Sequence, residues 1–329
     1  MKKRGLLCLL SSMIMLMSAA CGTTDSAGQA GTTADETVIM RIDDREILKS
    51  EYMVYLYTTT MNFISVGGED IFETDIDGQD AYELLEEQTI NTLRMLIATA
   101  RYAKENGIEL SDAVKEEAVT MAESFISQVS AEELAKMDIT LEELVPYMEE
   151  SYLFSMVYQQ LASECVVDTE AMQAYYKENE ETLYLESTYA EMDSIVVEDE
   201  ALAKEITARA RSGEDFLELF MEYDMDENAK MTEDGGYMML YGAQYASAFG
   251  DEFPAEGTIT DPIFVDDVYF IFKMNSVVVP TEDELISVSN YKFTSEKQTE
   301  YSEARIDELV KAQKVERYDD VFATVEHFR

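Results

Sequence analysis

Apolar residues separated by three or four positions dominate the first half of this chain, and this spacing predicts amphipathic helices. One helix is expected over residues 80–106, where Gly107 can end it, and another over 112–129. Ser130 and Thr140 each precede a glutamate by three residues. This spacing is typical of a capping box, in which side chains satisfy the free amides of a helix start, so two further helices are expected to begin there.

Other positions set the remaining boundaries of this half. Val38–Ile42 is expected to form a short strand, and Ser50 is expected to cap the aromatic-rich helix that follows it. Pro146 is expected either to bend the helix that starts after Thr140 or to occupy its first position. Asp168 is expected to cap one more helix, which runs through Lys177.

After Lys177, short apolar runs between turn residues replace the long helical pattern. This pattern predicts strands at Tyr189–Val197, Ile263-Phe264 and 268–274, and helices over 199–212 and 216–223. Beyond Pro280 a helical pattern returns, with Ser295 as its expected cap. A short strand is expected at Val315–Tyr318.

The order of these elements predicts an α+β protein with a discontinuous, mostly helical domain. Residues 37–178 and 281–329 are expected to form that domain, and residues 186–277 a compact α+β domain inserted into it. About 300 residues beyond the N-terminal segment are enough for two domains with their own cores.

The N-terminus has the pattern of a secretion signal. Basic residues at positions 2–4 precede an apolar run over residues 6–17. This run of about 12 residues is too short to span a bilayer as a helix. The sequence therefore predicts a targeting segment that is removed from the mature protein.

Small residues then precede Cys21, and this pattern resembles the lipobox of bacterial lipoproteins, with Ser18 in the place of the usual Leu. The resemblance implies cleavage after residue 20 and acylation of the Cys21 thiol, which would then begin the mature chain. Residues 21–36 are expected to be a flexible tether. Acyl chains hold a protein at a bilayer with about 0.8 kcal/mol per buried methylene. We therefore expect an extracytoplasmic protein at the outer face of a bacterial membrane, whereas the alternative is an ordinary cleaved signal followed by a chance cysteine.

The net charge of −45 restricts the class of partner. Loss of the basic signal residues would make it −48. Such a charge argues against nucleic acids or an anionic membrane bound through a basic face. It suits basic unfolded clients or divalent cations, and also a solvated surface that resists aggregation.

Histidine is nearly absent, because His327 is the only one in 329 residues. Histidine-based triads and most zinc sites are therefore excluded, and we expect no metal and no cofactor. Asp224, Asp226 and Glu227 are expected to form a solvated acidic loop, with a cation site as the alternative.

Several short motifs occur in a specific order between Tyr189 and Met274. They are Gly213–Phe216, Glu222–Asp224, Gly235-Gly236 and Gly257–Ile263. Their order and spacing resemble a parvulin-type peptidyl-prolyl isomerase domain. Near the N-terminus, the strand, the Ile47-Leu48-Lys49 step and the aromatic-rich helix resemble the start of the SurA/PrsA chaperone module.

The parvulin resemblance implies a set of site residues. Asp226 falls where parvulins carry a catalytic-site Cys or Asp, and Ser194 and Phe270 occupy the places of the two family histidines. Asp226 and Ser194 are thus the implied polar groups of a catalytic site. The implied peptide-binding residues are Tyr245, Phe249, Phe270, Met239 and Tyr241.

The chain as a whole resembles the PrsA foldases of Gram-positive bacteria. This resemblance implies a lipid-anchored chaperone that binds unfolded secreted polypeptides, and it leaves the oligomeric state open. Since no imidazole can orient the polar groups, prolyl isomerase activity is expected to be weak or absent. The alternatives are an active isomerase and a lipoprotein that delivers a small solute to a transporter. The latter class would need alternating βα units.

Overall fold

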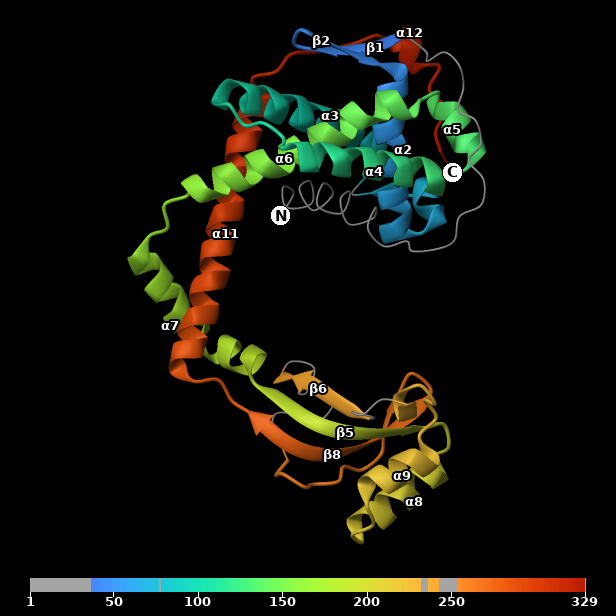
Figure 1. The fold of residues 1–329 in the computed structure, drawn as a ribbon, viewed down its shortest axis with the longest axis vertical. Helices are drawn as coiled ribbons and strands as arrows, with labels where there is room; N and C mark the ends of the chain where they lie inside the picture. Colours follow the sequence, from blue (N-terminus) through green and yellow to red (C-terminus); the bar gives the residue numbers. More distant parts are fainter. Residues whose placement is uncertain (1–36, 77, 232–235, 243–253, 329) are drawn as a thin grey trace. The chain divides into compact units, whose positions relative to one another are not determined.

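The computed structural model describes residues 37–76, 78–231, 236–242 and 254–328. The chain divides into two compact units, which are Met1–Val166 with Lys297–Arg329 (unit 1) and Val167–Glu296 (unit 2). Helices make up most of the described residues, with three small sheets among them (Figure 1). The predicted α+β class is therefore confirmed, whereas the domain limits expected at 178 and 281 stay a prediction.

The sheet of unit 1 joins the two ends of the described chain. β1 (Val38–Ile42) pairs antiparallel with β2 (Arg45–Leu48) on one side and with β9 (Val315–Arg317) on the other. Asp43, in the β1–β2 turn, has a positive φ of 55°. Its Oδ1 accepts the backbone N–H of Lys314 at 2.8 Å. The predicted first and last strands are thus confirmed, and they are neighbours in one sheet.

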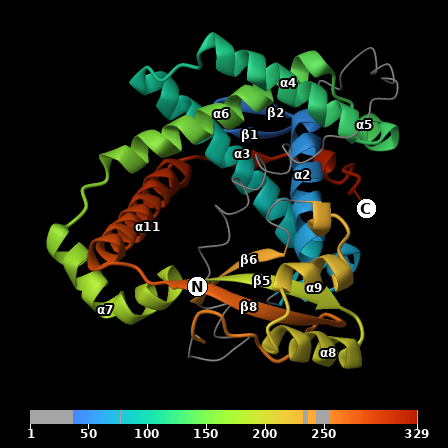
Figure 2. The ribbon, with the colours of Figure 1, turned by 60° about the horizontal axis from the view of Figure 1, so that its bottom comes forward.

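Helices form the rest of unit 1. They are α2 (Lys49–Gly67), α3 (Ala81–Asn106), α4 (Asp112–Gln128), α5 (Ala131–Met137), α6 (Leu141–Glu164), α12 (Asp319–Phe322) and the second half of α11 (Glu282–Lys311). The connection from α2 to α3 contains η1 (Glu69–Glu73) and the hairpin of β3 (Asp75–Ile76) and β4 (Gln79–Asp80). α6 lies against both α3 and α4 (Figures 1 and 2). Their core contains fully buried side chains such as Tyr52, Leu85 and Leu96.

Most of the predicted helix ends are confirmed. Ser130 and Thr140 each form a complete capping box with the glutamate three residues later. Asp168 accepts two backbone amides at the start of α7 (Thr169–Ser187). Gly107 ends α3 in the left-handed conformation, with a φ of 68°. These ends are determined locally, because each depends on residues within one turn of the helix end.

The prediction for Ser50 needs correction, and one of the two alternatives for Pro146 is excluded. Ser50 does not cap α2, because the backbone N–H of Lys49 still donates to the carbonyl of Thr37 at 2.8 Å and the strand passes directly into the helix. Ser50 consequently lies in the first turn and is buried. Pro146 lies inside α6, whose start is already formed at Thr140, so it does not occupy the first position.

Two helices are longer than predicted. α7 continues past Lys177, and α11 is a single helix in which Ser295 is an interior residue. The start of α11 is capped instead by Thr281, whose Oγ1 accepts a backbone amide of the first turn at 3.3 Å. Phe293 of α11 packs on Tyr175 of α7, with ring centroids 5.3 Å apart. The local sequence pattern from which the helix ends were predicted does not reveal this contact between two helices.

Unit 2 contains a four-stranded sheet among the described residues, in the order β6-β5-β8-β7. Its strands are β5 (Tyr189–Val197), β6 (Tyr237–Tyr241), β7 (Ile263–Val265) and β8 (Val268–Val278). α8 (Glu200–Arg211) and α9 (Phe216–Tyr223) pack on one face of it (Figure 2), and η2 (Ala229–Met231) follows α9. On that face Ile195 and Ile271 meet Ile206 and Leu219. The strands and helices predicted for this segment are confirmed, with β8 extended at its end.

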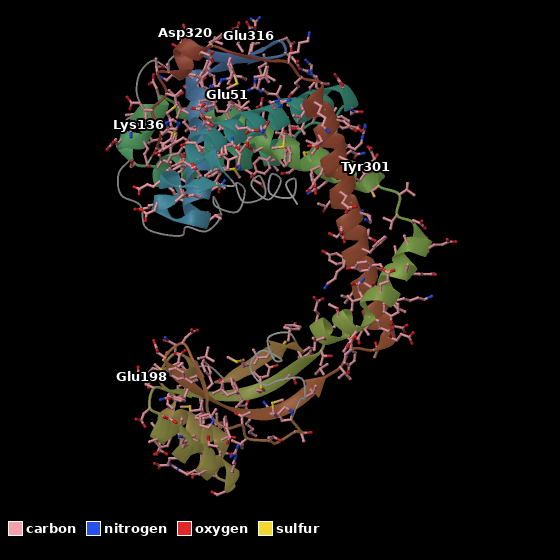
Figure 3. All side chains as sticks on the ribbon, turned by 180° about the vertical axis from the view of Figure 1, so that it is seen from behind. Glu51, Lys136, Glu198, Tyr301, Glu316 and Asp320 are labelled. Carbon is pink, nitrogen blue, oxygen red and sulfur yellow. The ribbon has the colours of Figure 1, made fainter. Side chains whose placement is uncertain are left out.

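Charged side chains lie mostly on the surface of unit 1. Glu316 and Asp320 are exposed, whereas Glu51 lies in the interior (Figure 3). Among the described residues, no helix combines the length and the apolar content that a membrane span requires.

Candidate functional site

Ser194 lies at the edge of β5, where β6 ends. Its backbone N–H and its hydroxyl both donate to the carbonyl of Gly236, at 2.6 and 2.9 Å. Two residues further on, the N–H of Val196 donates to Oδ2 of Asp224 at 2.7 Å, and its carbonyl accepts the N–H of Met225 at 3.0 Å. The segment after α9 thus continues the sheet edge beyond β6 and lies close to Ser194.

Asp224 is the buried carboxyl group of this edge, with 4% of the residue exposed. It accepts the backbone amides of Val196 and Asp226, each at 2.7 Å. Burial raises the pKa of Asp224, although these hydrogen bonds and the charge of Lys230 oppose the change. The prediction of a solvated loop is therefore wrong for Asp224. Its position directly after the apolar helix 216–223 was the available signal in the sequence.

Asp226 is exposed and holds a turn. Its Oδ1 accepts the backbone amides of Asn228 at 2.9 Å and Ala229 at 3.2 Å, and these residues lead into η2. The structure therefore brings Ser194, Asp224 and Asp226 to one end of the β5 edge. The Ser194 hydroxyl and the Asp226 carboxylate are both hydrogen-bonded to the backbone.

Phe270 lies on the face of the sheet opposite to α8 and α9. It is the cross-strand partner of Val196, and its ring stacks on Phe272 with centroids 5.7 Å apart. Phe272 in turn is opposite Ser194. Met192, Met274, Met238 and Leu240 belong to the same cluster, which we name the apolar sheet face. Phe270 and Ser194 thus share one face of the sheet.

Met239 and Tyr241 lie on the other face. Successive side chains of a strand alternate, and Met238 and Leu240 point to the apolar sheet face. Met239 and Tyr241 are 39% and 48% exposed. Because of this period of two, Met239 and Tyr241 do not share a surface with Phe270, and their role in peptide binding stays a prediction.

Met239 and Tyr241 belong to a second, partly exposed surface. Tyr241 packs on Tyr189, with ring centroids 5.5 Å apart. The hydroxyl of Tyr237 donates to Oε1 of Glu191 at 3.0 Å. We name Tyr189, Tyr237, Met239 and Tyr241 the aromatic strand surface. Tyr189 and Tyr237 were not predicted as site residues, because only the register of β5 and β6 shows that they are neighbours.

The remaining predicted residues cannot be placed in this geometry. Tyr245 and Phe249, expected to line a proline pocket, and Cys21, the expected acylation site, lie outside the described residues. In the part of the chain that is described, no group of His, Cys, Asp and Glu side chains is arranged to hold a metal ion.

The single histidine lies in unit 1. His327 packs on Tyr82, with ring centroids 4.7 Å apart, and its Nε2 is 3.6 Å from Oε1 of Glu86. Because the sequence has no other histidine, unit 2 contains no imidazole. Among the described residues near Ser194, the polar groups include the carboxyl groups of Asp224 and Asp226 and the ammonium group of Lys230, whose charge acts on Asp224.

Comparison with curated proteins finds similarity to several foldase proteins named PrsA. The chain is 24% identical over 255 residues to the foldase protein PrsA of Caldanaerobacter subterraneus, and the match covers 77% of each chain. It is 27% identical over 271 residues to PrsA of Clostridium botulinum, covering 77% of this chain and 79% of the relative. PrsA of Halalkalibacterium halodurans is 30% identical over 233 residues, covering 70% of this chain and 60% of the relative. No family model matches the chain.

Solved structures of the same kind are found as well. The foldase protein PrsA of Streptococcus pneumoniae aligns over 73% of this chain and 92% of its own, with 17% identity and a TM-score of 0.44. A SurA-like chaperone of Campylobacter jejuni aligns over 85% of this chain and 98% of its own, with 11% identity and a TM-score of 0.39.

Proposed function

From its similarity to the PrsA foldases, we propose that this PrsA-like chain is an extracytoplasmic folding factor that binds unfolded secreted polypeptides. The observation that carries the proposal is a sequence match that extends over 77% of this chain and of its relative. In the proposed arrangement an acylated Cys21 anchors the protein at the outer face of the cell membrane. Residues 37–178 with 281–329 offer a client surface, and residues 186–277 form a parvulin-like domain.

The parvulin-like domain is proposed to bind chains with little or no isomerase activity. Rotation about a peptide bond has a barrier of roughly 18–20 kcal/mol, and lowering it requires groups that are free to act on the imide. The Ser194 hydroxyl donates to a backbone carbonyl, and Asp226 accepts amides of its own turn. Phe270 supplies an aromatic ring at the place of a family histidine. Binding needs only apolar surface, which the aromatic strand surface offers.

An active isomerase is the alternative, and Asp224 favours it. Its buried carboxyl group has a raised pKa and binds the amide of Val196, two residues after Ser194. Groups with a shifted pKa are frequent at catalytic sites. A protease-coupled assay on a proline-containing tetrapeptide separates the two cases. A rate equal to the uncatalysed control supports the binding role. Catalysis that Asp226→Ala or Asp224→Asn abolishes would establish the alternative.

The folding-factor proposal predicts suppression of aggregation. A soluble form that begins at Gly22 should reduce light scattering by a chemically unfolded client after dilution, at equal molarity, because it shields exposed apolar segments. A similarly acidic protein without chaperone activity is the control for charge alone. Equal scattering with the protein and with this control would remove the main support for the proposal.

A further inference from the structure

The sheet of unit 1 ends at β9, the outer strand of the order β2-β1-β9. The N–H of Tyr318 donates to the carbonyl of Ile39 at 3.1 Å, which makes these residues a hydrogen-bonded pair of the antiparallel ladder. Such pairs alternate along a ladder, so the N–H and C=O groups of Val315 and Arg317 point away from β1. Within the described residues no strand pairs with this side of β9. β9 therefore presents an open strand edge.

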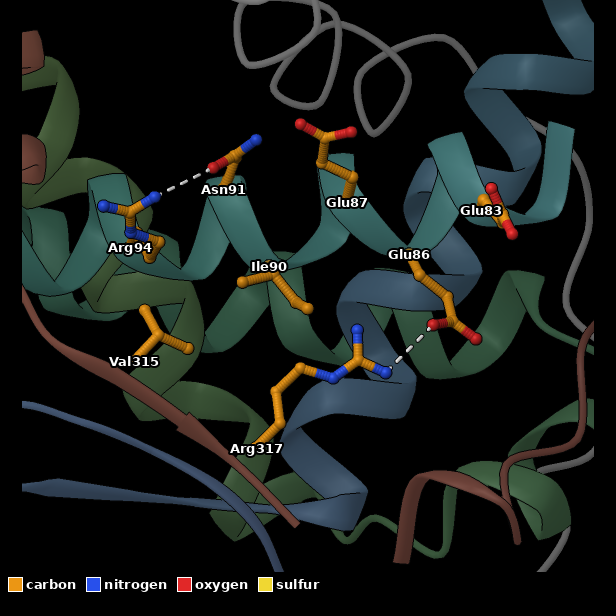
Figure 4. A pocket seen from close by; sticks show the side chains of 8 residues that line it. All are labelled: Glu83, Glu86, Glu87, Ile90, Asn91, Arg94, Val315 and Arg317. Atoms are coloured by element: carbon orange, nitrogen blue, oxygen red, sulfur yellow. Dashed lines mark hydrogen bonds and ion pairs between the residues drawn. The ribbon is translucent and has the colours of Figure 1, made fainter. Parts of the chain in front are cut away.

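A groove of about 560 Å³ lies between β9 and α3 (Figure 4). Val315 and Arg317 of β9 line one side, and Ile90 of α3 lies opposite them (Figure 4). Val315 is 38% exposed, and Ile90 is partly buried. An extended chain placed along this edge would thus meet an apolar contact as well as backbone partners.

Both guanidinium groups of the groove already have partners inside unit 1. Arg94 donates through Nη2 to the carbonyl of Val310 at 2.7 Å, near the end of α11. Arg317 lies 3.3 Å from Oε2 of Glu86, and its guanidinium carbon is 3.9 Å from the centroid of the Phe322 ring. These interactions hold the positive charges of the groove in place.

The carboxylates of Glu83 and Glu87 remain at the solvent side of the groove (Figure 4). They are four residues apart on α3, which places them one turn apart on one side of the helix. Glu87 accepts a hydrogen bond from Gln79 at 3.2 Å, and neither carboxylate forms an ion pair with a described residue. The groove is therefore complementary to a chain that carries positive side chains.

We propose that the open edge of β9 binds an extended, lysine- or arginine-bearing segment of an unfolded client as a fourth strand of the sheet. The proposal rests on the proposed function and defines which segments the chaperone prefers. Main-chain pairing does not depend on side-chain identity, which suits a protein that binds many clients. Side chains at alternate positions of the bound segment then determine which segments bind most tightly. Positive ones would lie near Glu83 and Glu87, and an apolar one near Ile90. A second copy of this chain is a poor occupant, since the net charge of −45 opposes edge-to-edge association.

The test is binding of a short fluorescent peptide to the soluble form that begins at Gly22. The peptide alternates threonine with lysine and valine, so that one face carries the positive and apolar side chains. One control peptide has glutamate in place of lysine. Another is methylated at alternate backbone nitrogens, which removes its strand-pairing donors. Fluorescence anisotropy should show binding of the first peptide and at least tenfold weaker binding of both controls.

Substitutions in the protein test the same contacts. Val315→Pro removes an N–H that points away from β1, and proline is tolerated at such an edge position. It should weaken peptide binding roughly fivefold, as expected for one lost hydrogen bond. Val315→Ala, which keeps the N–H, is the matched control. Glu83→Gln with Glu87→Gln should weaken binding roughly threefold at low salt and reduce its salt dependence. Far-UV circular dichroism checks that each variant is folded.

The outcomes separate this inference from the folding-factor proposal. If the protein suppresses aggregation but binds the methylated peptide as well as the parent peptide, the strand-edge site is wrong and the folding function stands. If the peptide binds at the edge but no client is protected, the peptide site stands and the folding function fails. Self-association that Val315→Pro abolishes would assign the edge to a second copy, and it would overturn the proposal.

Discussion

Arg45 binds two carboxylates at once inside unit 1. Its Nη2 donates to Glu51 and its Nη1 to Glu150, each at 2.6 Å. Burial raises the pKa of Glu51 to about 8, although the charge of Arg45 opposes this change, and burial also raises the pKa of Glu150. The single positive charge of Arg45 neutralises the negative charge of only one of the two carboxylates. The second carboxyl group is therefore expected to keep its proton at a pH where an unfolded glutamate has lost it.

This cluster predicts a dependence of stability on pH. Between pH 4.5 and about 8 the folded chain retains a proton at Glu51 that the unfolded chain has released, so the free energy of unfolding should fall as the pH rises through this window. Glu51→Gln imitates the protonated side chain and should reduce that fall by about 2 kcal/mol. Urea unfolding at both ends of the window measures it. Glu46→Gln, at an exposed ion pair with Arg41, is the control, and equal pH dependence in both variants would contradict the prediction.

At the scale of elements, the edge of β5 depends on the backbone at Gly236. Gly236 has a φ of 79°, and its carbonyl accepts both the N–H and the hydroxyl of Ser194. A Cβ at this position would lie 2.6 Å from the backbone oxygen of Ser194 and 3.0 Å from the ring of Phe220. The close approach of two backbone segments thus requires glycine here, and it also holds Ser194 in place.

A pair of glycine substitutions tests this statement. Gly236→Ala should destabilise unit 2 by about 3 kcal/mol, because a left-handed backbone strain is added to a clash with backbone atoms. Gly257 also has a φ of 79°, but a Cβ there would meet no atom within 4 Å. Gly257→Ala should therefore cost only the strain, about 1 kcal/mol. Thermal unfolding followed by circular dichroism compares them, and equal losses would show that the contact with Ser194 does not matter.

At the scale of the whole molecule, the proposed membrane anchor at Cys21 precedes both folded units in the sequence. In the proposed function the acyl group on Cys21 is the attachment to the membrane. Cys21→Ser should therefore release the protein into the medium of a Gram-positive host, whereas the unaltered protein should sediment with the membrane fraction. Incorporation of a labelled fatty acid provides a second measurement. A Cys21→Ser variant that still sediments with membranes would contradict acylation at this residue.

Elements whose ends depend on residues close together in the sequence were predicted correctly more often than those that depend on distant contacts. The caps at Ser130 and Thr140, the stop at Gly107 and the strand Tyr189–Val197 were all predicted, because each is encoded by a few neighbouring residues. The true start of α11 at Glu282, ahead of the expected cap at Ser295, was missed. The cap at Thr281 and the packing on α7 together determine the extent of that helix. The periodic pattern of apolar residues does not indicate the cap, and it indicates the packing on α7 only indirectly.

In the candidate site, too, the motifs located individual residues, whereas contacts between distant residues were not predicted. Ser194, Asp226 and Phe270 were placed correctly on their strands and loop by the motif resemblance, although their roles stay predictions. The separation of Phe270 from Met239 and Tyr241 follows from the strand register and its period of two, which no spacing along the chain revealed. The buried state of Asp224 depends on the amide of Val196, which is 28 residues away in the sequence.

The sequence alone determined the α+β class, the ends of most elements, the resemblance to PrsA and the absence of an imidazole from unit 2, because these depend on local patterns and composition. Only the tertiary structure decided which side chains share a face and which are buried. It also revealed the open edge of β9 beside α3, where residues more than 200 positions apart line one groove. Contacts between distant residues are made by the pairing of strands and the packing of helices, and these are properties of the folded chain.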